Sequence, residues 1–172
     1  MIRLATALLA TALLATALLA GCGYKLGEIR PTPMRSVRTL GVPTFKNKTF
    51  EPRVEVLLAD TFIKQLQRDG TYAIVSDDTA DAIVFGTLVK VERSALRSVQ
   101  NNVLATSEFS ISLDINYEVV QRVTGIVLMR GRVLGRSSFF DNNDLQMTER
   151  QAIPLAAQDA ANQLTIKISE GW

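Results

Sequence analysis

The sequence predicts an α+β domain in which a mainly antiparallel four-stranded sheet has two helices packed on one face. Strict alternation of apolar and polar residues over 108–119 predicts a long strand with one buried and one exposed face. The β-rich run Ile126–Phe140 follows the turn Thr124-Gly125, and so short a link predicts an antiparallel hairpin. Two further segments have apolar residues at three- and four-residue steps, which predicts two helices on the apolar side of the sheet.

The first 21 residues have the pattern of an export signal. Arg3 precedes an uncharged, Leu- and Ala-rich stretch that ends Leu19-Ala20-Gly21-Cys22. A basic start, a short apolar region and small residues at its end are typical of a cleaved signal peptide rather than of a spanning helix. We expect residues 1–21 to be removed. Arg3 is the only charged residue among them, so removal takes one positive charge from a net charge of +2 and leaves a nearly neutral mature chain.

The end of this segment resembles the lipobox of bacterial lipoproteins. The resemblance implies cleavage before Cys22, a diacylglycerol thioether on its sulfur and an acyl chain on the new N-terminus. Several acyl chains anchor a protein firmly in a bilayer, since each buried CH₂ contributes about 0.8 kcal/mol to the free energy of membrane binding. Gly23, not Asp, follows the cysteine. In this the sequence resembles enterobacterial lipoproteins that are sorted to the outer membrane. The alternative is a plain secretory signal followed by an incidental cysteine.

The composition excludes several kinds of site. The 172 residues include no His and one Cys, which excludes a His-based catalytic triad, an intramolecular disulfide and a His- or Cys-cluster metal site. A net charge of +2 gives no electropositive field for nucleic acid. We therefore expect no metal, no cofactor and no enzyme. A carboxylate-based glycan hydrolase is the remaining enzymatic alternative, but its candidates lie in predicted turns, where Asp is common: Asp77, Asp78, Asp81, Asp141 and Asp144.

The mature chain is predicted to be a lipidated tether over 22–36 and a single domain over 37–172. Val37–Phe45 is a short β-prone segment, and the polar residues 46–49 predict a turn. The next apolar residues predict a helix that begins after Pro52 and ends at Gly70. Its buried stripe comprises Val54, Leu57, Leu58, Phe62 and Leu66.

Two strands are predicted before the alternating one. Tyr72–Val75 is short, and the longer Ala82–Val91 places Ile83, Phe85, Val89 and Val91 on one face. In the alternating strand the buried residues are the odd-numbered ones, namely Phe109, Ile111, Leu113, Ile115, Tyr117 and Val119.

A second helix is predicted at the end of the chain. Thr148 and Gln151 have the spacing of a capping box. Pro154 follows soon after, and it predicts a kink or a later helix start. One stripe of this helix comprises Ala157, Ala160, Ala161, Leu164 and Ile168.

Several segments together resemble the LptE family of lipopolysaccharide (LPS)-assembly outer-membrane lipoproteins. They are the Cys22-Gly23-Tyr24 start, the run from Val42 to Phe50, Glu55–Leu58, Gln65–Gly70, Ala80–Ile83 and the hairpin at Gly125. The resemblance covers the mature chain in the family's order. It implies a non-enzymatic protein, anchored in the outer membrane of a Gram-negative bacterium through Cys22, on the periplasmic side or inside a barrel lumen. It further implies a one-to-one complex with the LptD β-barrel, as a plug that helps the barrel assemble and assists LPS insertion into the outer leaflet.

One set of basic residues is a candidate contact for LPS phosphates. Arg130, Arg132 and Arg136 share parity in the last strand and therefore one face, with Leu128 and Leu134 between them. Guanidinium groups suit bidentate phosphate contacts, and the leucines suit acyl chains. The alternative is an ordinary solvated sheet face with cross-strand ion pairs. A second candidate set is Lys90, Arg93 and Arg97.

Other functions remain open at the level of the sequence. The β-α-β-β order at the start of the domain also resembles that of curli-secretion-like pore lipoproteins and of activators of cell-wall synthases. A pore component would assemble into rings, whereas a plug would bind one barrel.

Overall fold

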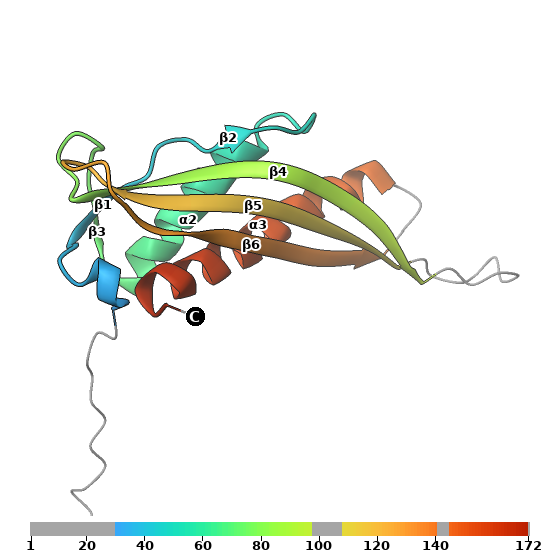
Figure 1. The fold of residues 1–172 in the computed structure, drawn as a ribbon. Helices are drawn as coiled ribbons and strands as arrows, with labels where there is room; N and C mark the ends of the chain where they lie inside the picture. The colour runs from blue at the N-terminus through green and yellow to red at the C-terminus, as the bar shows by residue number, and fades with distance from the viewer. Residues whose placement is uncertain (1–29, 98–107, 141–144, 172) are drawn as a thin grey trace, which may run out of the picture.

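A computed structural model describes residues 30–97, 108–140 and 145–171. Its three long strands form a curved sheet, and two helices cover one face of this sheet while the other face is left open (Figure 1). Cys22, Asp141 and Asp144 lie outside the described residues, as does Arg97 beyond its backbone.

The sheet is mixed and has six strands in the order β3-β1-β4-β5-β6, with β2 also paired to β4. The long strands β4, β5 and β6 are antiparallel, as the hairpin predicted. The expectation of four strands is wrong, because three short strands pair in parallel, and a helix between β1 and β3 provides the crossover that a parallel pair needs. The strand bounds are β1 Thr39–Gly41, β2 Lys46–Asn47, β3 Ala73–Ile74, β4 Ala82–Arg97, β5 Glu108–Gln121 and β6 Val127–Phe140.

The predicted β-prone segment and polar turn divide differently in the structure. Val37–Phe45 contributes only β1 (Thr39–Gly41), whereas Lys46 and Asn47, expected in a turn, form β2. The backbone N–H of Lys48 donates to the carbonyl of Leu88 at 2.9 Å, which extends this pairing. Polar side chains are compatible with β2 because it pairs only along one edge of β4 and is not in the core.

The helix over residues 54–69 begins and ends as predicted, and of its predicted stripe only Leu57 is partly rather than fully buried. This helix, α2 (Val54–Asp69), buries Val54, Leu58, Phe62 and Leu66. Gly70 ends it at φ 74°, and its N–H donates to the carbonyl of Leu66 at 3.0 Å, because glycine adopts the left-handed conformation without a Cβ clash.

The last helix begins earlier than predicted. α3 spans Leu145–Ser169, so Thr148 is not the N-cap, and Pro154 lies inside the helix. Ala152, which precedes the proline, is 2% exposed. The predicted stripe is buried as expected: Ala157, Ala160, Ala161, Leu164 and Ile168.

The helix-covered face of the sheet holds the core. In β5 the odd-numbered residues from Ile111 to Val119 are buried there, as the alternation predicted, whereas Phe109 is only partly buried. In β4 the prediction is wrong, because Ala82, Val84 and Leu88 are buried whereas Phe85 is 43% exposed on the open face. A register shift between Leu88 and Lys90 then places Val91 on the helix-covered side, since one extra residue inverts the parity of a strand.

The segment before β1 packs on the domain from residue 30 onward. The Arg30 guanidinium donates to the carbonyls of Val37 at 2.7 Å and Thr71 at 2.8 Å, and lies 5.1 Å from the centre of the Tyr72 ring. Met34, in the short 3-10 helix η1 (Thr32–Met34), is fully buried. These contacts fix the position of residue 30 on the domain.

Candidate functional site

The open face of the sheet carries the first predicted set of basic residues. Arg130, Arg132 and Arg136 lie in β6 opposite Glu118, Asn116 and Ser112 of β5. All three arginines are exposed, and their even-numbered positions point away from the helices, as their shared parity predicts.

The second predicted set is divided between the two faces of the sheet, because positions 90 and 93 differ in parity within β4. Lys90 lies opposite Asp114, on the open face. Arg93 lies opposite the buried Ile111, on the helix-covered side, and its guanidinium contacts the Glu51 carboxylate at 2.6 Å. The backbone of Arg97 pairs with Glu108. The six predicted residues therefore do not form one cluster.

Ion pairs hold some of these cations. Arg132 makes two hydrogen bonds to the Asp114 carboxylate, each of 2.5 Å, and this carboxylate raises the pKa of Arg132 above its usual value. Lys90 pairs with Glu92 at 2.9 Å, with both side chains more than half exposed. Both contacts fit the alternative of ordinary ion pairs on a solvated sheet face.

Arg130 is in a different environment. Within the described residues its guanidinium has no carboxylate partner, and it lines a hollow of about 680 Å³ on the open face. Lys46 and Lys48 line the opposite side of the hollow, and Arg132 also borders it. Apolar side chains of Phe85, Val89 and Val120 are part of the lining, and Glu118 is the one acidic residue in it.

The hollow combines four cations with an apolar surface, which is the chemistry of a site for an anionic amphiphile. Lys46 and Lys48 were missed as site residues because they reach the hollow only through the parallel pairing of β2 with β4, where Lys46 lies opposite Thr87. No short-range sequence pattern signals such a pairing.

A second hollow of about 320 Å³ lies further along the same face. Lys90, Arg132 and Arg136 line it, but so do the carboxylates of Glu92 and Asp114. These carboxylates offset the positive charge, so the first hollow suits an anion better.

Two of the carboxylates considered for an enzyme, Asp78 and Asp81, have structural partners. Asp81 accepts the backbone N–H groups of Arg38 and Thr39, each at 2.9 Å, and these bonds lower its pKa. A hydrogen bond from Ser76 lowers the pKa of Asp78. A general acid needs a raised pKa, so these shifts have the wrong direction for that role. Across the described ranges, no three metal-ligating side chains gather into a potential metal site.

Residues 30–97, 108–140 and 145–171 include no helix with the length and apolar character needed to cross a membrane.

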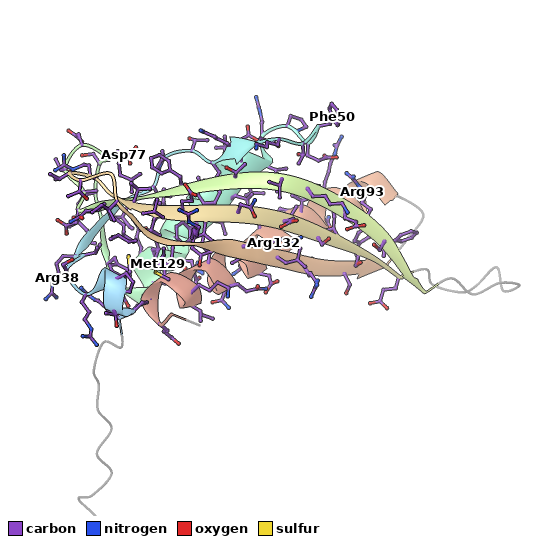
Figure 2. The ribbon with its side chains drawn as sticks, viewed as in Figure 1. Arg38, Phe50, Asp77, Arg93, Met129 and Arg132 are labelled. Atoms are coloured by element: carbon purple, nitrogen blue, oxygen red, sulfur yellow. The ribbon has the colours of Figure 1, made fainter. Side chains whose placement is uncertain are left out.

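Figure 2 shows Arg93 and Arg132 on the long strands and Phe50 projecting from the loop between β2 and α2. The loop is built around Asn47, whose amide donates to the Glu51 carbonyl and the Glu55 carboxylate, each at 2.7 Å.

Comparison with known proteins gives a family and a fold. The family model described as "LptE: Lipopolysaccharide-assembly" matches residues 37–168. No curated protein matches the sequence significantly. Among solved structures, the chain is similar to a hypothetical protein from Chlamydia trachomatis, with 7% identity, TM-score 0.56, and 78% of this chain and 96% of that chain covered.

Two further structures have the same fold. A minor lipoprotein from Acinetobacter baumannii has 15% identity and TM-score 0.52, with 77% of this chain and 93% of that chain covered. Protein XCC0632 from Xanthomonas campestris has 10% identity and TM-score 0.52, with 83% and 92% covered. At such identities these structures show a shared fold and nothing further.

Proposed function

Because this chain belongs to the LptE lipopolysaccharide-assembly family, we propose that it is an outer-membrane lipoprotein that plugs the LptD-type LPS-export β-barrel, helps it assemble and assists LPS insertion into the outer leaflet. The observation that carries the proposal is the extent of the family match, which includes all six strands and nearly all of α3. Lipid modification of Cys22 is part of the same proposal, and it is supported by the lipobox-like sequence.

The fold supports a role as a plug. A large outer-membrane barrel encloses a polar, water-filled lumen that a plug must fill with a polar surface. The open face of the β4–β6 sheet has such a surface, because the outward positions of β5 include Ser112, Asn116 and Glu118 and those of β6 include Arg130 and Arg136. The buried apolar side chains of these strands, such as Ile111, Leu113 and Ile115, lie on the other face, which α2 and α3 cover.

Depletion of the protein tests this role in cells. The proposal predicts that loss of the lipoprotein lowers the amount of correctly assembled barrel and the amount of LPS exposed at the cell surface. Reduced activity on cell-wall glycan with normal surface LPS would contradict the proposal and favour a cell-wall role.

The 680 Å³ hollow is the place at which we expect LPS phosphates to bind. Lys48 and Arg130 lie on its two sides, so phosphate groups bound between them would contact both cations. The adjoining Phe85 and Val120 would contact acyl chains. Asp114 already neutralises Arg132, so we expect that arginine to contribute less than Arg130.

Charge reversal tests this site. The double variant Lys48→Glu/Arg130→Glu is expected to weaken binding of purified LPS by at least about tenfold, or about 1.4 kcal/mol, with a loss that shrinks at high salt. The matched control is Arg68→Glu, an exposed change at the end of α2, which should leave binding unchanged. Equal binding by both variants and the unmodified protein would contradict an LPS site in the hollow.

A further inference from the structure

The open face of the sheet changes its chemistry along the three long strands, which run side by side (Figure 1). Near Glu118 of β5, the first hollow places the apolar side chains of Phe85 and Val120 beside the cation Arg130. The second hollow lies further along, around Ser112 of β5. The six residues of β5 from Glu118 to Ser112 span about 20 Å. The face is therefore apolar and cationic at one place and hydroxyl-bearing at the other.

Three serine hydroxyls line the second hollow. Ser94 of β4 lies opposite Ser110 of β5, and Ser112 lies two residues closer to the first hollow, opposite Arg136 of β6. Each hydroxyl can both donate and accept a hydrogen bond. Because the three residues belong to paired strands, the backbone fixes the spacing of their hydroxyls before any ligand arrives.

The charges beside these hydroxyls are largely balanced. Lys90 contacts Glu92 at 2.9 Å, and Arg132 contacts Asp114 at 2.5 Å. With Arg136, the lining has three cations and two carboxylates, a net charge of +1, whereas the first hollow has four cations and one carboxylate, a net charge of +3. An anion therefore gains little in the second hollow.

The second hollow instead suits a ligand with many hydroxyl groups. A carboxylate has about four lone-pair sites and a guanidinium has five N–H groups, so the paired Asp114 and Arg132 can still bond to a neutral ligand. Leu134 is also part of the lining and offers an apolar contact to the C–H groups of a sugar ring. The volume of about 320 Å³ is at the lower end for small-molecule sites. This combination of groups is the chemistry of a saccharide site.

The two hollows adjoin, since Arg132 lines both of them. A single ligand with an apolar part, a phosphorylated part and a saccharide part could therefore occupy both hollows at once. LPS has these parts in this order, because its acyl chains and its outer sugars are attached to the same phosphorylated sugar unit. Phosphates bound in the first hollow would direct the outer sugars toward Ser112 and Ser110.

We propose that the second hollow binds the saccharide of LPS, so that one LPS molecule lies lengthwise along the open face of the sheet. Its acyl chains would contact Phe85 and Val120, and its outer sugars would lie over Ser110 and Ser112. The inference rests on the LPS site proposed for the first hollow. It makes the lipoprotein selective for LPS that carries outer sugars.

A comparison of two purified lipids tests the saccharide contact. Lipid A has the acyl chains and phosphates of LPS but lacks the outer sugars. We expect the full mature lipoprotein, in detergent solution, to bind LPS at least about fivefold more tightly than lipid A, through hydrogen bonds to the sugars. The double variant Ser110→Ala/Ser112→Ala is expected to lose this preference while it binds lipid A as before. The loss should persist at high salt, because the missing groups are neutral.

The matched control is Ser137→Ala in β6. Ser137 lies opposite Ile111, so it is on the helix-covered side of the sheet. This variant should keep the full preference for LPS. Unchanged binding of lipid A by the double serine variant also shows that the variant is folded.

Several results would overturn the proposal. Equal affinity of the unmodified protein for LPS and lipid A would remove the saccharide contact and leave the phosphate site in place. The same conclusion would follow if the double serine variant kept its preference or if Ser137→Ala lost it equally. Binding of a phosphate-free cell-wall glycan fragment as tightly as LPS would assign the hollow to another glycan. Failure of both lipids to bind would overturn the phosphate site, and this inference with it.

Discussion

At the scale of single residues, Asp81 joins the beginnings of two strands. Its carboxylate accepts two backbone N–H groups that precede and begin β1, while its own N–H donates to the Thr39 hydroxyl at 2.9 Å. The N–H groups hold the pKa of Asp81 below its usual value of 3.8. A pKa lower in the folded than in the unfolded state stabilises the fold above the unfolded value, and this stability is lost as pH falls through the folded value.

Asp81→Asn is therefore expected to destabilise the domain at neutral pH and to have less effect in acid. Because the carboxylate is exposed and solvent screens it, we expect a loss of about 1 kcal/mol at neutral pH. Denaturant titrations at neutral pH and well below 3.8 measure the two differences. A loss that is equal at both values would show that the charge of Asp81 makes no contribution.

Two phenylalanines test the assignment of core and surface. Phe62 on α2 is fully buried, and its ring centre lies 6.1 Å from that of Phe45. Phe62→Ala should cost about 3–5 kcal/mol of unfolding free energy through the cavity it leaves. Phe50 is fully exposed on the loop before α2, so Phe50→Ala should change stability by less than about 0.5 kcal/mol. Similar denaturant midpoints for the two variants would contradict the packing described here.

At the scale of elements, Gly135 determines how closely α3 approaches β6. A Cβ at this position would lie 2.1 Å from the carbonyl oxygen of Ala156 and 2.6 Å from the Cβ of Ala160. Both contacts are to the helix, whose backbone cannot move aside locally. The small residues of α3 and the glycine of β6 together allow this close packing.

Gly135→Ala is expected to destabilise the domain by at least about 1–3 kcal/mol, because the helix must move away from the sheet. Thermal unfolding followed by circular dichroism measures the loss. Ser138→Ala, an exposed change in the same strand, is the control and should leave the transition nearly unchanged. A Gly135→Ala variant as stable as the control would contradict the close helix–strand contact.

The elements with local periodicity were predictable from the sequence. The alternation of β5, the stripe of α2 and the turn at Gly125 are each patterns of neighbouring residues, and the structure has all three. Two features were not predictable. The parallel strands depend on partners far away in sequence, and the register shift near Lys90 inverts parity without changing the local composition.

The same distinction applies to the candidate site. The common face of Arg130, Arg132 and Arg136 followed from parity within one strand, and parity also separates Lys90 from Arg93. Which of these two lies on the open face depends on the register shift before Lys90. Lys46 and Lys48 joined the site through long-range pairing. Arg30, grouped with the tether in the sequence, contacts the domain through carbonyls of two distant segments.

At the scale of the whole molecule, the domain has two unlike sides and two unlike ends. The helices cover the apolar face of the sheet, and the open face is polar and holds the cationic hollow (Figure 1). Residue 30, the first described residue, is bound to the carbonyls of Val37 and Thr71, at the end of the domain where β1 and β3 begin. This arrangement suits a protein that is held at a membrane by one end and presents a polar sheet to a polar lumen.

The direct test of the central proposal is the mass of the complex that the tagged mature lipoprotein forms in detergent-solubilised outer membranes. We predict one copy of the lipoprotein bound to one large β-barrel protein. A ring built of many copies of this chain, recovery of a cell-wall synthase alone, or a lipoprotein without any barrel would contradict its role as the plug of the LPS-export barrel.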